Sequence, residues 1–274
     1  MIAKALTIAG SDSGGGAGIQ ADLKTFTALG VYGMTAITAI TVQNTVGVFG
    51  VHPIPPDTVY NQIKVVAEDI GVDALKTGML FSEEIIQAVS QAIKDFKLNN
   101  LVVDPVMIAK SGDPLLKESA RKTLLDKLLP LALVITPNIP EAEDICKFEI
   151  KNVEDMEKAC KVIHSLGSKY VVLKGGHLEG DTKIDVIYDG KNFEYLKAKS
   201  ILTKNTHGTG CTFSAAITAF LAKGENPIDA IKKAREYIQG AIENSLSIGK
   251  GHGPLNHTWN LPVSFSNNRV NTSK

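Results

Sequence analysis

The chain has 274 residues, 44% of them hydrophobic, and its 29 basic side chains balance its 29 acidic ones. Such a chain can bury a large core, and the lack of net charge excludes a general attraction to nucleic acid or anionic membranes. The three cysteines, Cys146, Cys160 and Cys211, include no CxxC pair, which argues against disulfides and thiolate metal sites. No apolar stretch is long enough to span a bilayer. We expect one cytoplasmic domain, residues 1–274, that binds small molecules.

The first predicted unit is a strand at residues 6–9, a glycine-rich turn at 10–18 and a helix with a one-sided apolar face. The sequence Gly16-Ala17-Gly18 begins a GxGxxA pattern, which would suit a dinucleotide-binding loop. However, the next predicted strand, 34–42, ends in Gln43 and Asn44, so it supplies no acid to bind a ribose. Two interpretations remain open: the loop binds another ligand, or it is only a tight turn.

Strand and helix patterns alternate along the rest of the chain. Helical patterns cover 59–70, 82–96 and 153–166, and strands cover 74–77, 101–104, 133–136 and 170–174. Near 184–197, Asp189-Gly190 separates two alternating segments, which predicts a β-hairpin. A last long helix begins at Asn226-Pro227, and we expect the tail after about residue 261 to be loosely ordered. The fold class is α/β, with a mostly parallel, doubly wound sheet and helices on both faces.

Polar or glycine-containing segments follow the predicted strands. Ligands of such sheets bind in the crevice outside the carboxyl ends of the strands. We therefore expect these segments to converge on one crevice: residues 10–18, Gln43-Asn44, Gly78-Met79, 104–107, 136–138 and 174–176.

A second glycine-containing loop, 206–210, runs directly into an apolar helix that we expect to begin near Cys211 and to stop at Gly224. The first N–H groups of a helix lack intrahelical partners and lie at the positive end of its dipole. Gly208 and Gly210 would let an anion approach this bare backbone, and phosphate is the obvious anion. The alternative is a helix start with flexible glycines and a buried cysteine.

Together these segments supply the parts of a phosphoryl-transfer site. Transfer needs positive charge on the phosphoryl oxygens, which Lys174, backbone N–H groups and Mg²⁺ would provide. Magnesium prefers carboxylates and water, so Asp104 and Glu141 are the candidate metal residues, with Asn138 beside them.

Five blocks of sequence then identify a resemblance. The chain resembles the hydroxymethylpyrimidine/phosphomethylpyrimidine kinases of thiamine biosynthesis, a family of the ribokinase-like superfamily, over nearly its whole length to about Trp259. The blocks are ALTIAGSDSGGGAGIQAD at 5–22, DPVM at 104–107, TPNIPEA at 136–142, KGGH at 174–177 and HGTGCT at 207–212.

The resemblance implies a ribokinase-like fold and a kinase that uses ATP and Mg²⁺. It would phosphorylate 4-amino-5-hydroxymethyl-2-methylpyrimidine and then convert the monophosphate to the diphosphate at the same site. It further implies that Gln43 binds the polar edge of the ring and that Met79 and Val106 pack against the ring. Gly10, Ala17 and Asp22 complete this implied pocket.

In the nucleotide half, the resemblance implies that Lys174 contacts the ATP phosphates. Asp104, Asn138 and Glu141 would act through Mg²⁺. The implied anion hole runs from Thr206 to Cys211 and includes Gly208, Thr209 and Gly210. The family commonly forms dimers, so a homodimer is expected.

Cys211 stands where the wider superfamily usually has an aspartate base, although cysteine is typical of the hydroxymethylpyrimidine branch. A thiol with a reference pKa of about 8.5, lowered by a helix N-terminus, would accept the hydroxyl proton. Alternatively, Cys211 only positions the hydroxyl, because a loose transition state needs little help from a base.

Three other functions compete with this one. The first is phosphorylation of pyridoxine, pyridoxal or pyridoxamine, alone or as a second activity. The second is a dinucleotide-dependent oxidoreductase built on the 16–18 glycines, and the third is a non-catalytic pyrimidine sensor. A nucleophilic pair of His207 with Cys211 is disfavoured. Packing or solvated roles are expected for His252 and His257, and a packing role for Trp259.

Overall fold

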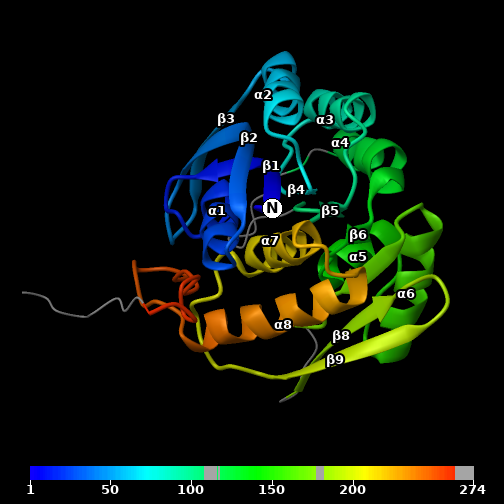
Figure 1. The fold of residues 1–274 in the computed structure, drawn as a ribbon. Coiled ribbons are helices and arrows are strands. Elements are labelled where there is room, and N and C mark those ends of the chain that lie inside the picture. The colour runs from blue at the N-terminus through cyan, green and yellow to red at the C-terminus, as the bar shows by residue number, and fades with distance from the viewer. Residues whose placement is uncertain (108–115, 117, 177–181, 263–274) are drawn as a thin grey trace, which may run out of the picture.

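The computed structural model describes residues 1–107, 116, 118–176 and 182–262, which form a nine-stranded sheet covered by helices (Figure 1). This confirms the predicted α/β class. The predicted loose tail, apart from its first residues, and His177 of the KGGH block lie outside the described residues. Within the described part of the chain, no helix combines the length and apolarity needed to cross a membrane.

Strands and helices alternate through most of the chain. The strands are β1 (Lys4–Asp12), β2 (Tyr32–Gln43), β3 (Val48–Pro53), β4 (Ala74–Thr77), β5 (Leu101–Val103), β6 (Val134–Ile135), β7 (Tyr170–Leu173), β8 (Thr182–Tyr188) and β9 (Phe193–Lys199). The helices are α1 (Gly18–Ala28), α2 (Pro56–Asp69), α3 (Glu83–Asp95), α4 (Glu118–Thr123), the π-helical η1 (Leu124–Leu128), the 3-10 helix η2 (Leu129–Leu131), α5 (Ile139–Cys146), α6 (Val153–Ser165), α7 (Thr209–Ala222) and α8 (Pro227–Glu243).

The strands lie in the order β3-β2-β1-β4-β5-β6-β7-β8-β9. The six from β2 to β7 in this order are mutually parallel. At one edge β3 pairs antiparallel with β2, and at the other β8 pairs antiparallel with both β7 and β9. The predicted hairpin is confirmed, because β8 and β9 pair from Thr182 with Lys199 to Tyr188 with Phe193. The carboxyl ends of the six parallel strands therefore lie along one edge of the sheet.

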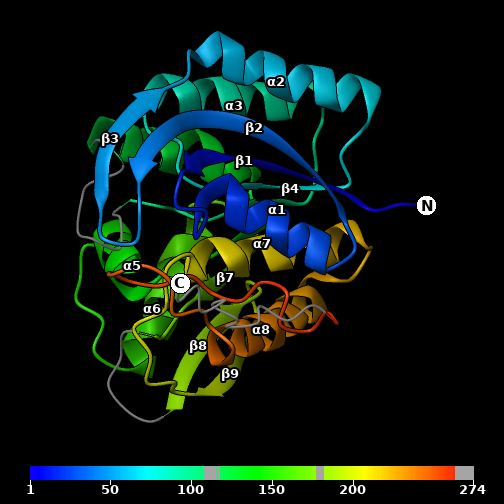
Figure 2. The same ribbon diagram turned by 90° about the vertical axis from the view of Figure 1, so that its left-hand side faces the viewer.

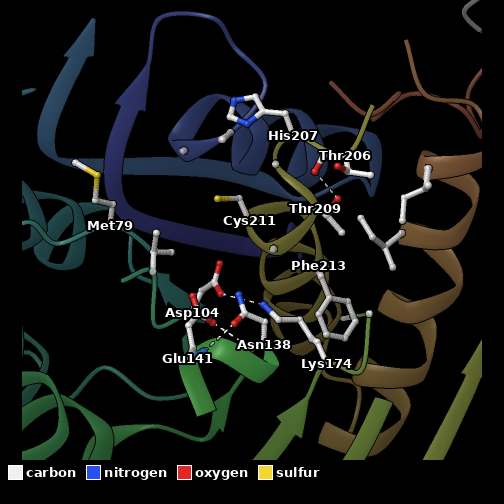
Figure 3. Close-up of a pocket in the computed structure, with 18 of the residues that line it drawn as sticks. Met79, Asp104, Asn138, Glu141, Lys174, Thr206, His207, Thr209, Cys211 and Phe213 are labelled. Carbon is white, nitrogen blue, oxygen red and sulfur yellow. Dashed lines mark hydrogen bonds and ion pairs between the residues drawn. The ribbon is translucent and has the colours of Figure 1, made fainter. Parts of the chain in front are cut away.

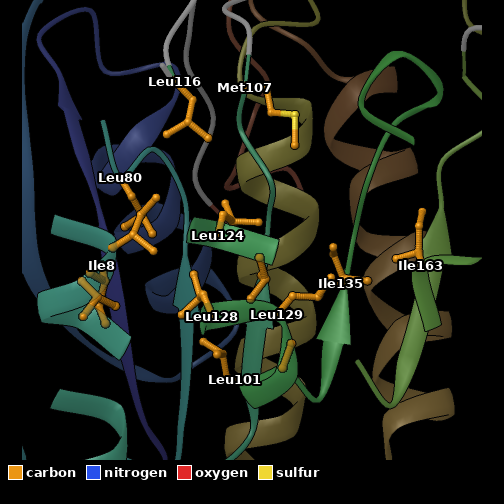
Figure 4. Close-up of a cluster of buried hydrophobic side chains, with 14 of the residues drawn as sticks. Ile8, Leu80, Leu101, Met107, Leu116, Leu124, Leu128, Leu129, Ile135 and Ile163 are labelled. Carbon is orange, nitrogen blue, oxygen red and sulfur yellow. The ribbon is translucent and has the colours of Figure 1, made fainter. Parts of the chain in front are cut away.

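Alternate residues of each central strand face two separate cores. On β1, Leu6 and Ile8 join the core beneath α2–α6, which Figure 4 shows, and Ala5 joins the core beneath α1, α7 and α8. Figures 1 and 2 show these two groups of helices on opposite sides of the sheet. Since both faces are covered, β5 can be apolar throughout, and its residues Leu101–Val103 are all buried.

Predicted helix boundaries are confirmed where a capping residue marks them. The Ser82 hydroxyl accepts a hydrogen bond from the Ile85 N–H at the start of α3, and the Asn226 side chain accepts one from the Asp229 N–H at the start of α8. Gly30 and Gly224 follow α1 and α7 with φ of +69° and +85°.

Three parts of the fold were not predicted. Strand β3 is a short strand at the edge of the sheet, and none of its residues is fully buried. Its sequence, VFGVHP, does not alternate between apolar and polar residues, so no strand was predicted there. The α4–η1 segment changes from α- to π-helical hydrogen bonding, which breaks the 3.6-residue period. Helix α5 has only eight residues, and its start was interpreted as a metal site alone.

The packing roles predicted for His257 and Trp259 are confirmed. The Trp259 indole N–H donates to the Tyr237 carbonyl at 3.1 Å, and its ring lies where a Cβ on Gly240 would be 2.3 Å away. His257 is 4% exposed, and its Nε2 lies 3.0 Å from the Thr212 hydroxyl on α7. Both side chains therefore hold the C-terminal segment against α7 and α8.

The burial of His257 generates a pH-dependent stability. Burial lowers the pKa of His257 from 6.5 to about 4, with a smaller contribution from the charge of Lys24. Between pH 6.5 and 4, His257 is therefore protonated in the unfolded chain but neutral in the folded chain. The free energy of unfolding is highest above pH 6.5 and decreases as the pH falls towards 4. The loss should reach about 3 kcal/mol.

Urea unfolding of the wild type and His257→Gln at several pH values between 4 and 7 measures this effect. Glutamine keeps a polar group near Thr212 but does not titrate. We expect the variant's unfolding free energy to fall less steeply as the pH is lowered. Equal pH slopes for the two proteins would contradict a neutral, buried His257.

Candidate active site

A cavity of about 880 Å³ lies at the carboxyl ends of the parallel strands. Each of the six strand-end segments contributes to its lining, so their predicted convergence is confirmed. Of the predicted site residues, Asp22 alone does not line the cavity. Those that do are Gly10, Ala17, Gln43, Met79, Asp104, Val106, Asn138, Glu141, Lys174, Thr206, Gly208, Thr209, Gly210 and Cys211. Figure 3 shows several of them facing one another across the cavity.

The backbone N–H groups of the 10–18 loop bind a carboxylate from the loop itself, that of Asp12. Asp12 is 3% exposed, and its Oδ1 accepts the Gly14 N–H at 2.8 Å, whereas Oδ2 accepts the N–H groups of Gly16 at 3.0 Å and Ala17 at 2.8 Å. Burial raises the pKa of Asp12, but hydrogen bonds from His207 and the loop outweigh it and the pKa is lowered. These N–H groups are therefore satisfied internally, which disfavours the dinucleotide-binding interpretation.

The second glycine loop has an open end at the start of α7. The helix begins at Thr209, and Gly208 before it has φ +83°, a left-handed conformation that glycine adopts readily. The Thr209 hydroxyl donates to the Thr206 carbonyl at 2.7 Å, which stabilises the turn. Gly210 and Cys211, the second and third helical residues, line the cavity. This arrangement suits an anion.

Two carboxylates surround the cavity's lysine. Lys174, directly after β7, places its Nζ 3.4 Å from Asp104 Oδ1, directly after β5. Burial lowers the pKa of Lys174, but the charges of Asp104 and Glu141 outweigh it, so the pKa is raised and the ammonium stays protonated. A Cβ on Gly210 would lie 3.4 Å from both Lys174 Nζ and Asp104 Oδ2. The lysine is thus next to the start of α7.

Asn138 and Glu141 form a capping box at the start of α5. The Glu141 N–H donates to Asn138 Oδ1, and the Asn138 N–H donates to Glu141 Oε2, each at 2.9 Å. Burial raises the pKa of Glu141 to about 7, although Lys174 opposes this shift. In the part of the chain that the structure describes, His, Cys, Asp and Glu side chains do not gather in groups of three or more that could bind a metal ion. Two carboxylates still fit Mg²⁺, which is commonly held by one or two carboxylates, substrate phosphates and water.

The predicted lowering of the Cys211 pKa is wrong. Burial raises the pKa of Cys211 to about 12, although the ammonium of Lys76 opposes this shift. The helix N-terminus does not compensate for the loss of solvent around the sulfur. Figure 3 shows the thiol directed into the cavity between Met79 and Thr209, so its position is that expected for contact with a substrate.

One end of the cavity suits a small aromatic ring. Met79 is 8% exposed, and a Cβ on Gly10 would lie 3.2 Å from its Cε, so Gly10 leaves room beside the thioether. Gln43 adds an amide whose Oε1 accepts the Thr41 hydroxyl at 3.0 Å, and Val106 adds an apolar wall.

Asp22 lies beneath this end rather than in its wall. Its two carboxylate oxygens are used by the Lys76 ammonium at 2.9 Å and the Thr7 hydroxyl at 2.6 Å, and the Asp22 and Lys76 side chains are completely buried. Burial lowers the pKa of Lys76, but Asp22 and the neighbouring acids outweigh it, and the pKa is raised. The structure thus places Asp22 under the site, in contrast to the pocket position that the resemblance implied.

The opposite end of the cavity, at α8, is lined by both polar and apolar side chains, among them Arg235 and Gln239. Its lining includes Ile201, Phe213 at the start of α7, and Ile238 and Ile242 from α8. Asp185 on β8 supports this end, because its Oδ1 accepts the Gly175 N–H at 2.9 Å, beside Lys174. The site therefore runs from a ring-sized end, past the charged centre, to the end at α8.

The sequence analysis missed one residue of the site, Asp12, and considered another, His207, with the wrong partner. Asp12 was not singled out, although an aspartate followed by glycines commonly accepts the N–H two residues later. His207, considered only with Cys211, instead places its Nε2 2.9 Å from Asp12 Oδ2. The pairing joins residues 195 positions apart, so no local signal indicates it.

The chain is similar to known proteins over most of its length. A family model described as phosphomethylpyrimidine kinase matches residues 12–256. The chain is 49% identical to the hydroxymethylpyrimidine/phosphomethylpyrimidine kinase of Bacillus subtilis, covering all of this chain and 99% of that one.

Two solved structures are similar as well. One is the ADP complex of Bacillus subtilis pyridoxal kinase, with a TM-score of 0.88, 46% identity, and coverage of 95% of this chain and 99% of that one. The other is a phosphomethylpyrimidine kinase from Clostridium difficile, with a TM-score of 0.79, 48% identity, and coverage of 88% and 100%. The predicted ribokinase-like fold is confirmed by these likenesses.

The contact between the two glycine loops can be tested by substitution. A Cβ on Gly208 would lie 1.8 Å from the Gly16 carbonyl oxygen, whereas a Cβ on Gly224, which has a similar φ, would meet no atom within 4 Å. Both alanine variants carry the roughly 1–2 kcal/mol of left-handed strain, but only Gly208→Ala forces the loops apart. We expect Gly208→Ala to lower kcat about 100-fold and Gly224→Ala to leave it near wild type. Equal kcat values, with melting measured in parallel, would contradict the close contact.

Proposed function

Because this chain belongs to the phosphomethylpyrimidine kinase family, we propose that its cavity performs both phosphorylations of the thiamine precursor. The enzyme transfers the γ-phosphoryl group of ATP to the hydroxymethyl group of 4-amino-5-hydroxymethyl-2-methylpyrimidine, and then a second one to the monophosphate. The observation that carries this proposal is the buried Lys174 ammonium, held by Asp104 beside the open start of α7. A non-catalytic sensor would not need this combination.

The pyrimidine occupies the ring-sized end of the cavity. Met79 and Val106 pack on its faces, and Gly10 and Ala17 leave space for it. The Gln43 amide has both a donor and an acceptor, which match the ring nitrogen and amino group on the polar edge of the aminopyrimidine. A ring that leaves this amide unpaired would lose about 1–3 kcal/mol of binding free energy.

ATP occupies the rest of the cavity. Its terminal phosphates lie against the N–H groups at the start of α7, where Thr206, Thr209 and Gly210 line the site and Lys174 supplies positive charge. The adenine lies at the α8 end, against the apolar side chains of Ile238 and Ile242. The ADP complex of the similar pyridoxal kinase supports nucleotide binding by this fold.

Asp104 and Glu141 are the residues that would hold Mg²⁺, with Asn138 beside them. When bound, Mg²⁺ neutralises charge on the phosphate oxygens. Glu141, whose pKa is about 7 through burial, would be held in its ionised form by a bound cation. Asp104 also keeps Lys174 charged, so it orders the centre of the site even before nucleotide binds.

Cys211 positions the acceptor hydroxyl. Because burial raises its pKa to about 12, the thiol is almost entirely neutral at pH 7. General-base help matters little when the transition state is loose, because the hydroxyl proton is lost late. The thiol therefore acts by contact and orientation.

A second candidate substrate is pyridoxal or a related vitamer. The chain is 46% identical to a pyridoxal kinase and 49% identical to a hydroxymethylpyrimidine/phosphomethylpyrimidine kinase. Because these sequence identities are so similar, they do not indicate which of the two substrates the chain phosphorylates. Gln43 favours the aminopyrimidine, yet an apolar wall made by Met79 and Val106 would also accept a pyridine ring.

Measuring ADP release with ATP and Mg²⁺ tests these substrates. Hydroxymethylpyrimidine, its monophosphate and pyridoxal are supplied separately at equal concentrations. We expect turnover with both pyrimidines and little with pyridoxal. Comparable pyridoxal turnover would establish a dual activity, and no turnover with either pyrimidine would refute the proposed function.

Replacing Lys174 tests its role in transfer. Lys174→Met keeps the length of the side chain but removes the charge, so we expect kcat to fall about 100- to 1,000-fold and pyrimidine Kd to change little. Lys204→Met, at an exposed lysine just before the 206–210 loop, is the control. An equal loss of kcat and pyrimidine affinity would argue against a phosphate role.

Replacing Cys211 separates positioning from proton transfer. We expect Cys211→Ser to retain kcat within about tenfold, because serine still offers a hydrogen-bonding group, and Cys211→Ala to lose more. A general base would contribute about 100- to 10,000-fold. A loss of that size in a folded Cys211→Ser variant would therefore favour the base role.

We propose in addition that the protein is cytoplasmic, and that it is a homodimer, as the resemblance implies. The antiparallel β2–β3 pair presents exposed apolar side chains, including Val42, Val46 in the intervening turn, and Phe49. Sedimentation velocity would distinguish the dimer from a monomer.

A further inference from the structure

One interaction ties the two glycine loops together across the mouth of the site. The carboxylate of Asp12, in the first loop, accepts a hydrogen bond from His207 Nε2, which directly precedes Gly208 in the second, at 2.9 Å. We call this interaction the Asp12–His207 clasp. Neither residue has a chemical step in the proposed transfer, so their pairing at the site needs an explanation of its own.

The clasp is rigid on the Asp12 side. Its carboxylate is held by three backbone N–H groups of its own loop, and the Asp12 N–H donates to Gln20 Oε1 on α1 at 2.8 Å. A side chain bound at this many points has one accessible orientation. The carboxylate therefore offers His207 an acceptor whose position follows that of the whole 10–18 loop.

The His207 side is held as closely. Its backbone N–H donates to the Gly253 carbonyl at 3.1 Å, and its side chain is 12% exposed. The imidazole lies where a Cβ on Gly16 would be 2.4 Å from its Cδ2. Gly208 also packs closely against the Gly16 carbonyl. The two loops are therefore in contact at two adjacent points, and these contacts fix their relative position.

The clasp also reaches the residue that binds the ring edge. Ser13, next to Asp12, accepts the Gln43 N–H at 2.8 Å and donates to the Gln43 carbonyl at 2.6 Å. The Gln43 amide nitrogen lies 3.5 Å from His207 Nε2. The segments that bind the acceptor ring and the segment that binds phosphate are consequently parts of one hydrogen-bonded unit.

We propose that His207, held by Asp12, is a positioning residue that sets the distance between the acceptor hydroxyl and the transferred phosphoryl group. This inference rests on the proposed phosphoryl transfer. A shift of about 1 Å in the relative position of reacting groups can cost about 100-fold in rate. Loosening the clasp should therefore lower kcat and leave the binding of each substrate nearly unchanged.

Variants of His207 that keep or remove the donor test this proposal. His207→Gln places an N–H near the position of Nε2, His207→Asn is too short to reach Asp12, and His252→Asn at an exposed histidine is the control. We expect kcat to fall about 100-fold in His207→Asn, with both KM values within about threefold. We expect His207→Gln to retain most of the activity.

Two further readouts distinguish positioning from general destabilisation. If the hydroxyl is misplaced, water competes for the phosphoryl group, so His207→Asn should release more than one ADP per phosphorylated pyrimidine. Hydrogen exchange of the ligand-free protein should rise in peptides covering 10–18 and 206–212 in His207→Asn, but not in His207→Gln or in the rest of the chain.

The proposal is overturned if His207→Asn keeps wild-type kcat, if only KM rises, or if His207→Gln is as impaired as His207→Asn. It is also overturned if exchange rises uniformly over the chain. Failure of the proposed function is a separate result, because the wild type would then turn over neither pyrimidine while the exchange comparison would still report on the clasp.

Discussion

The partial burial of the Lys174 ammonium, whose side chain is 16% exposed, is the constraint on which the site depends. An unpaired buried charge would be strongly destabilising, so a carboxylate must lie beside it. Asp104 meets this need from a strand two places away in the sheet, and Glu141 meets it from the start of α5. The lysine and its partners come together only when β5, β6 and β7 are paired in register, so formation of the sheet also assembles the charged centre.

The two glycine loops have opposite properties for the same physical reason. Backbone N–H groups that point to one place attract an anion. In the first loop the anion is the chain's own Asp12, which makes the loop rigid, whereas the first N–H groups of α7 face the cavity. The first loop, whose N–H groups bind Asp12, is therefore structural. The second loop has no carboxylate of its own at the start of α7, so its N–H groups can bind a ligand. The glycines are needed in both, because Gly208 and Gly16 are in contact.

A protein without net charge thus concentrates its electrostatics at one edge of its sheet. Buried pairs at this edge, Asp22 with Lys76 and Asp104 with Lys174, lie around Cys211 and contribute opposing charges to its surroundings. Because burial outweighs these charges and raises its pKa, the thiol remains neutral in spite of its place at a helix start. This environment is consistent with a site in which positions and phosphate-binding groups, rather than a strong base, do most of the catalysis.

Local patterns in the sequence were enough to predict the alternating elements, the hairpin at 189–190 and the helix that starts beyond Gly208, because periodicity and capping act over a few residues. The rule that parallel strand ends converge also predicted that the six strand-end segments meet at one cavity, but not the part of its lining that comes from α8 and the segment after β9. Tertiary structure alone decided three matters. It placed Asp22 against Lys76 below the cavity, raised the pKa of Cys211 by burial, and joined Asp12 to His207. Each depends on desolvation or on contacts between distant segments, which no local pattern records.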